Sequence, residues 1–173
     1  MKKVLLITLL CFGFITANAQ RFKPGLKAGL NSTNLTGDAN TDARFGFYIG
    51  GLVDFLVSDK FHVQPELMYS TEGADDDAGI SYLRLPIMGK YYITENFNIQ
   101  AGPQIAFKMS TEEEVIDEAT KSTDIALGVG GAYELETGLF FDIRYNFGLT
   151  NISDVDGIDL GNVGLQFGLG YRF

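Results

Sequence analysis

The sequence of 173 residues contains no tryptophan, one cysteine and one histidine. The cysteine, Cys11, lies in an amino-terminal segment that we expect to be removed, so the mature chain has no thiol for a disulfide, a nucleophile or a metal site. The histidine, His62, has neither a cysteine nor a positioned serine to complete a catalytic triad. We therefore expect no catalytic residues, no cofactor and no enzyme activity.

Long apolar runs are also scarce, because the only one, residues 4–15, opens the chain behind two lysines. It is too short to cross a bilayer comfortably as a helix. The small-residue pattern at residues 17–19 follows it and is typical of a secretory cleavage site. The sequence predicts a signal peptide over residues 1–19 and one mature domain over residues 20–173.

Basic residues are few, since 13 Lys and Arg stand against 22 Asp and Glu for a formal net charge of −9. Removal of the signal peptide takes away two lysines and no acid, which makes the mature chain still more acidic. Such a surface argues against nucleic acid as a partner.

Apolar and polar residues alternate strictly in many segments of the chain. In the last segment Val163, Leu165 and Phe167 share one strand face, and Asn162 and Gln166 share the other. Period two fits the mature chain better than the helical period of 3.6. It predicts strands over residues 24–31, 45–57, 61–70, 81–93, 97–109, 123–135, 139–149 and 162–173. Most of them reach the roughly 9 to 11 residues that a tilted membrane strand needs.

The connections between these strands alternate in length. Those after the second, fourth and sixth strands are tight, and the other links are long and acidic: 35–44, 71–80, 110–122 and 150–161. Short periplasmic turns and long outer loops are typical of outer-membrane barrels. We therefore expect an all-β fold, an eight-stranded antiparallel up-and-down transmembrane β-barrel in the outer membrane, with lipid as its first partner. The alternative is a soluble lipocalin-like barrel, which would invert the faces and line a cavity with apolar residues.

The polar strand faces predict a lumen filled with paired charges. An eight-stranded barrel is just wide enough for side chains to fill it, and an unpaired buried charge is costly. The expected network comprises Lys27, Asp54, His62, Glu66, Arg84, Lys90, Lys108, Asp124, Glu134, Asp142, Arg144 and Arg172. Aromatic girdles at the two interfaces explain most of the tyrosines near the strand ends, a group that includes Tyr92. The prolines Pro65, Pro86 and Pro103 each remove a ladder donor, which leaves the strand register open at those points and predicts bulges there.

Two features invite a chemical role. His62 has Glu66 as the nearest same-face carboxylate on its own strand, roughly 13 Å away at strand rise, and we favour a hydrogen-bonded interior histidine over a base in a lipid-modifying enzyme. Asp154, Asp156 and Asp159 lie around a glycine in the last long link and are weak calcium candidates. A solvated acidic loop is the favoured interpretation of that segment, so we expect no metal site.

Several motifs resemble the PorT-like outer-membrane barrel family of Gram-negative bacteria, often labelled porin family. They are Tyr-Leu-Arg-Leu-Pro-Ile at residues 82–87, Lys-Tyr at 90–91, Ala-Gly-Pro at 101–103 and the segment 144–152. The carboxy-terminal Gln166, Gly168, Tyr171 and Phe173 are similar to the signal that the barrel-assembly machinery recognises. The resemblance implies assembly in the outer membrane by that machinery, and it supplies no catalytic residues.

The leading hypothesis is a non-enzymatic outer-membrane barrel with a filled lumen and acidic outer loops that contact the surroundings or a partner protein. An accessory component of a protein-secretion or envelope complex is the main alternative. A lipid-modifying barrel enzyme and a small-solute channel are further alternatives, and the channel requires a lumen less filled than we expect.

Overall fold

The computed structural model describes residues 22–37, 43–74, 78–111, 121–150 and 160–173. No helix among them is long and apolar enough to cross a membrane. The strands are β1 (Phe22–Gly37), β2 (Arg44–Leu56), β3 (Phe61–Ala74), β4 (Ala78–Tyr92), β5 (Phe97–Thr111), β6 (Thr123–Glu134), β7 (Leu139–Gly148) and β8 (Leu160–Arg172).

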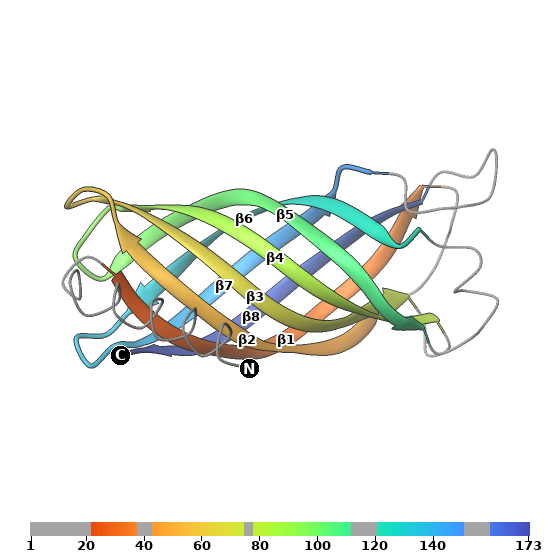
Figure 1. Ribbon diagram of the computed structural model, residues 1–173, viewed down its shortest axis with the longest axis horizontal. Coiled ribbons are helices and arrows are strands. Elements are labelled where there is room, and N and C mark those ends of the chain that lie inside the picture. Colours follow the sequence, from red (N-terminus) through yellow and green to blue (C-terminus); the bar gives the residue numbers. More distant parts are fainter. Residues whose placement is uncertain (1–21, 38–42, 75–77, 112–120, 151–159) are drawn as a thin grey trace, which may run out of the picture.

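The eight strands close into a barrel in which each pairs with the next along the chain (Figure 1). Closure is made by antiparallel pairing of β8 with β1, which places Gly168 opposite Gly29. A closed barrel has no free edge strand. The predicted all-β, eight-stranded antiparallel up-and-down barrel is confirmed.

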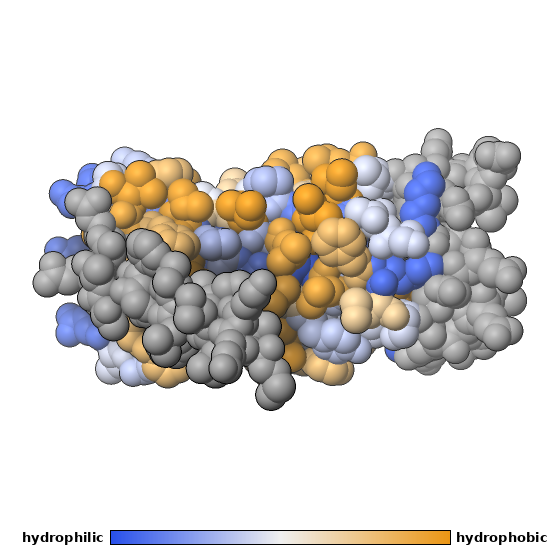
Figure 2. Space-filling view, in the orientation of Figure 1, coloured by the Kyte–Doolittle hydropathy of each residue, from blue (hydrophilic) through white to orange (hydrophobic). Residues whose placement is uncertain are grey.

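The two faces of each strand differ in chemistry. On β7, Phe141 and Ile143 point outward and are 50% and 47% exposed, whereas Phe140, Asp142 and Arg144 are buried. Apolar side chains cover much of the outer wall between the two ends of the barrel (Figure 2). The faces are the reverse of those in a lipocalin-like barrel, because the apolar set is outside and the charged set is inside.

Several strands run further toward the long links than the alternation predicts. β1 continues to Gly37, and β3 and β4 remain paired out to Ala74 and Ala78. The predicted long loop over residues 71–80 is therefore wrong. Residues 71–74 are small or polar, so they lack an apolar face from which a strand could be predicted, but backbone pairing continues through them.

The prolines interrupt the ladder without shifting it. The β3–β4 pairing stops after Pro65↔Ile87 and resumes at Met68↔Arg84 in the same register, and the β4–β5 pairing skips two positions beyond Pro86 in the same way. The expectation of bulges at the prolines is wrong, because the register is the same on both sides of each proline. A register shift lies instead between Ser81 and Tyr82 on β4.

Three tight turns, residues 57–60, 93–96 and 135–138, lie at the end of the barrel where β1 begins and β8 ends (Figure 1). We call this end the short-turn mouth. Gly138 has a φ of +89°, a conformation that side chains other than glycine rarely adopt, and its N–H closes the last turn on the carbonyl of Leu135 at 2.9 Å.

Candidate functional site

The barrel interior holds most of the ionisable side chains of the described strands. Nine residues of the expected network are buried: Lys27, Asp54, Glu66, Arg84, Lys90, Asp124, Asp142, Arg144 and Arg172. His62, Lys108 and Glu134 are half-buried. Alternation explains this placement, because every second residue of a barrel strand faces the axis.

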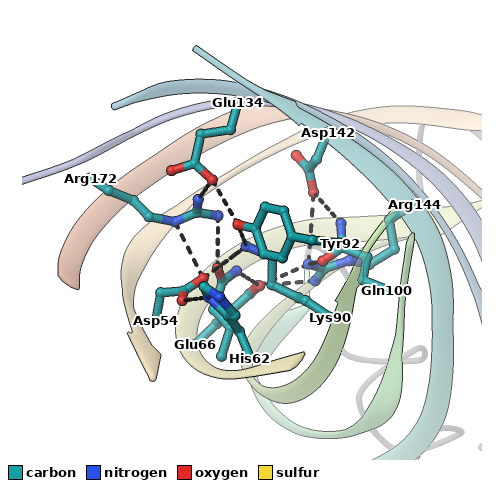
Figure 3. Close-up of polar contacts among 11 residues, drawn as sticks. Asp54, His62, Glu66, Lys90, Tyr92, Gln100, Glu134, Asp142, Arg144 and Arg172 are labelled. Atoms are coloured by element: carbon teal, nitrogen blue, oxygen red, sulfur yellow. Dashed lines mark hydrogen bonds and ion pairs between the residues drawn. The ribbon is translucent and has the colours of Figure 1, made fainter. Parts of the chain in front are cut away.

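A fork of two hydrogen bonds crosses the centre of the lumen. Arg144 on β7 donates from Nη1 to Glu66 Oε2 at 3.0 Å and from Nη2 to Glu66 Oε1 at 2.7 Å. β3 and β7 are four strands apart in a ring of eight, so the fork joins opposite walls (Figure 3). Beside it, Lys27 Nζ lies 2.5 Å from Asp142 Oδ2, and Arg144 also donates to Gln100 Oε1 at 3.2 Å. The middle of the barrel is thus bridged by charge-assisted bonds.

A second cluster lies nearer the short-turn mouth. Lys90 Nζ donates to Asp54 Oδ2 at 2.8 Å, to Tyr92 Oη at 3.1 Å and to Gln64 Oε1 at 3.3 Å. The other Asp54 oxygen lies 2.5 Å from Nδ1 of His62. The His62 ring packs against Tyr92, with ring centroids 4.6 Å apart.

Arg172 links the end of β8 to this cluster. Its guanidinium pairs with Glu134, and its Nε lies 3.6 Å from Asp54 Oδ2. Glu134 also accepts a 2.7 Å bond from the Tyr92 hydroxyl. The guanidinium carbon lies 4.4 Å from the centroid of the Phe140 ring. Polar residues of five strands, β2, β3, β4, β6 and β8, therefore close the lumen at this level (Figure 3).

A third cluster fills the lumen toward the long links. Arg84 pairs with both oxygens of Glu72 and lies 3.4 Å from Asp124 Oδ2. Glu72 also accepts bonds from Asn162 Nδ2 at 2.7 Å and from Ser70 Oγ at 2.8 Å. Glu72 is therefore the hub of this cluster, and it joins β3, β4 and β8.

Two interior residues are missing from the expected network. Glu72, which is 2% exposed, lay in the segment predicted as loop, although it continues the inward series of Met68 and Ser70 and could have been found from it. Tyr92 was named among the tyrosines near strand ends, most of which were expected in girdles, but it lies on the inward face of β4, as alternation along that strand predicts, where the ring is 9% exposed and its hydroxyl bonds inside the barrel. A buried tyrosine hydroxyl needs polar partners, and Glu134 and Lys90 supply them.

His62 finds its carboxylate on the neighbouring strand. Asp54 lies on β2, diagonal to His62 in the β2–β3 register, which a search along β3 alone does not reveal. This arrangement orients an imidazole, but a triad also needs a nucleophile. Within the part of the chain that the structure describes, no hydroxyl group hydrogen bonds to His62.

The remaining expected sites divide between the end of β8 and the undescribed segments. Gln166 is 6% exposed and faces the lumen, and Tyr171 and Phe173 are 42% and 69% exposed on the outer wall. The calcium candidates Asp154, Asp156 and Asp159 lie outside the described residues, as do residues 1–21 with the predicted signal peptide. Where side chains are described, no group of three or more His, Cys, Asp or Glu could hold a metal ion.

Comparisons with known proteins agree with this geometry. The sequence profile of a family described as outer membrane protein beta-barrel domain matches residues 17–154. Among solved structures, Ail, the attachment invasion locus protein of Yersinia pestis, is 16% identical with a TM-score of 0.56, over 88% of this chain and 99% of Ail. Neisserial surface protein A is 11% identical with a TM-score of 0.57, over 87% of this chain and 97% of that protein. At such identities the likeness shows a shared fold alone. No curated protein matches the chain.

Proposed function

The chain belongs to the outer membrane protein beta-barrel domain family, and from that premise we propose that it acts as a non-conducting, non-enzymatic barrel of structural or interaction type. It is an integral protein of the outer membrane, where the apolar outer wall contacts lipid. We further propose that residues 1–19 are a cleaved signal peptide, and that residues 20–173 form the mature barrel.

The Arg144–Glu66 fork is the observation that carries the proposal of a closed lumen. It spans opposite walls at the centre, and the Lys90–Asp54 pair and the Arg172–Glu134 pair lie behind it. Opening a water path would require these charge-assisted bonds to break and the side chains to move apart across the lumen. Charge pairing of this kind supports a plug of side chains.

Planar-bilayer recording tests the closed lumen directly. The purified barrel, inserted at known density, is expected to give no steady conductance above that of the protein-free bilayer. Steady unitary steps from the unmodified protein would overturn the proposal and favour a small-solute channel. Glu66→Ala combined with Arg144→Ala removes the central fork, and a conductance that appears only in this double variant would place the block at the fork.

The strand ends support an orientation and a route of assembly. Short turns on the periplasmic side are the rule for barrels of this class, which supports a periplasmic orientation of the short-turn mouth. Gln166, Gly168, Tyr171 and Phe173 are proposed as the signal for the barrel-assembly machinery. The narrower kinship with PorT-like barrels rests on the motifs at residues 82–87 and 144–152, and it likewise stays a proposal.

An accessory role in a secretion or envelope complex is the second candidate function. It is favoured by exposed charged side chains on the short turns, such as Lys60, Glu95 and Glu136, which lie where a periplasmic partner could reach them. Crosslinking in the native envelope followed by mild detergent extraction tests it. A stoichiometric protein partner supports the accessory role, and a barrel recovered alone counts against it.

A lipid-modifying enzyme is not favoured, because His62 faces the lumen and bonds to Asp54 while lipid lies outside the wall. Mass spectrometry of lipid A from cells with and without the protein checks this conclusion. The expected spectra are identical. A mass change that disappears in His62→Ala would establish the enzyme instead.

A further inference from the structure

A cavity of about 580 Å³ opens at the short-turn mouth. Its volume falls within the roughly 300 to 1,000 Å³ of sites that hold small molecules. Asp54, His62, Tyr92, Glu134 and Arg172 line it, and they belong to the hydrogen-bonded cluster described above, which closes the barrel at this level. The cavity is therefore a cup with a polar floor and an opening along the barrel axis.

Backbone contacts fix the order of the elements around the rim. Tyr92 N donates to the Lys60 carbonyl at 2.8 Å, and Glu134 N donates to the Asn96 carbonyl at 2.8 Å. Arg172 N donates to the Gly138 carbonyl at 2.9 Å, which brings the end of β8 beside the last turn. The rim is thus a closed ring of β1, the three tight turns and β8, held by its own main chain.

Charges of opposite sign lie on opposite arcs of this ring. Lys23 and Lys60 are exposed on the arc from β1 to β3, and Glu95 and Glu136 are exposed on the arc from β4 to β7. None of these four side chains forms an ion pair with a described residue. Asp59 adds one acid beside Lys60. The floor charges, by contrast, neutralise one another through the Arg172–Glu134 and Lys90–Asp54 pairs.

We propose that the short-turn mouth binds a short unblocked peptide, with its carboxylate against Lys23 and Lys60 and its ammonium against Glu95 and Glu136. An eight-stranded barrel has a backbone diameter of roughly 16 Å, from strand spacing and tilt. The four charged rim residues line the cavity, and the length of their side chains shortens the span that a ligand must cover. A tripeptide is at most about 10 Å long, so its two ends reach the opposite arcs together.

Three features favour a peptide over other charged ligands. A simple anion would meet only the two lysines and would face the acids on the other arc. A zwitterionic lipid headgroup carries both charges, but its chains must stay in the bilayer, whereas the cavity opens inside the barrel wall. Asn96 on the rim and the Tyr92 ring on the floor suit the amide groups and small side chains of a peptide.

The test uses the full mature barrel in lipid nanodiscs and follows backbone amide shifts of residues 93–96 and 135–138 by NMR. The probe is tri-alanine, and the expected result is saturable shifts with a dissociation constant near 1 mM, because exposed ion pairs contribute little each. N-acetyl-tri-alanine and tri-alanine amide each lack one charge and should bind about three- to tenfold more weakly. Phosphoethanolamine, the soluble headgroup, should bind at least as weakly as the blocked peptides.

Paired variants tie binding to the two arcs. The double variant Lys23→Gln with Lys60→Gln should bind tri-alanine about three- to tenfold more weakly than the unmodified chain does. It should also bind tri-alanine and tri-alanine amide equally well. The double variant Glu95→Gln with Glu136→Gln should likewise bind tri-alanine more weakly, and it should bind tri-alanine and N-acetyl-tri-alanine equally well. Lys121→Gln, at the opposite end of the barrel, is the matched control and should bind as the unmodified chain does. All these changes are at exposed positions, and a native NMR spectrum verifies each fold.

Three results would overturn the proposal: no shifts with tri-alanine up to about 10 mM, equal affinity for free and blocked peptides, or tighter binding of phosphoethanolamine than of tri-alanine. The last result would assign the mouth to headgroups. None of these results depends on conductance. A failure of the peptide proposal would therefore not contradict the proposal of a closed lumen, which the bilayer recordings test separately.

Discussion

Arg144 and Glu66 face each other from opposite walls of the barrel, and their side chains meet in two parallel hydrogen bonds of 3.0 Å and 2.7 Å. Arg144 is 1% exposed and Glu66 is 4% exposed. Paired in this way, the two charges satisfy each other. Either one left alone would be a buried ion with only neutral partners and more distant charges.

Removing one member of this pair should destabilise the barrel far more than removing both. Glu66→Leu leaves the Arg144 charge buried without its carboxylate, and the expected loss is about 3 to 5 kcal/mol in the free energy of unfolding. Glu66→Leu with Arg144→Met removes both charges and should lie within about 1 kcal/mol of the unmodified chain or above it. Urea unfolding in lipid vesicles measures both. Equal losses in the two variants would mean that the fork contributes little.

A side chain at position 168 should destabilise the barrel. A Cβ at this position would overlap both Asp142 Oδ1 and the Tyr48 hydroxyl, which fill the space that the glycine leaves. We expect Gly168→Ala to cost about 1 to 3 kcal/mol, because the Lys27–Asp142 pair must move. Gly51→Ala is the matched control, since its nearest neighbour outside the adjoining residues would be the Gly25 carbonyl at 3.9 Å. The same unfolding assay should show no loss for the control, and a similar loss in both would point to glycine flexibility instead.

The turn at Gly138 should depend on glycine for a different reason. Its φ of +89° is strained for any other residue, and a Cβ there would also meet the Arg172 carbonyl. Gly138→Ala is expected to lose about 1 to 3 kcal/mol and to broaden the NMR signals of the short-turn mouth. Gly89→Ala, whose Cβ would make ordinary contacts of 3.5 Å, should keep both the stability and the spectrum. A sharp native spectrum for Gly138→Ala would contradict the strain argument.

The alternation of apolar and polar residues predicts most of the fold, because side chains of a strand repeat with a period of two and one face of each strand is apolar. It places Arg144 and Glu66 on inward faces, and both are buried there. It does not say which inward residues meet, because partners such as His62 and Asp54 come from different strands and depend on register and barrel tilt. Alternation also fails to predict the position of Glu72. β3 extends beyond the apolar part of the wall, where its residues no longer alternate between apolar and polar, although the backbone pairing continues.

The contact between hydrocarbon and the outer wall is the central claim, and a single fluorescent residue tests it most directly. The chain has no tryptophan, so Phe141→Trp and Phe140→Trp each introduce one emitter. The two residues are adjacent on β7, at nearly the same depth, but Phe141 is 50% exposed on the outer wall and Phe140 is 1% exposed inside. In vesicles of lipids with brominated acyl chains, the Trp at residue 141 should be strongly quenched and the Trp at residue 140 largely protected. Equal quenching, or stronger quenching at residue 140, would contradict the account.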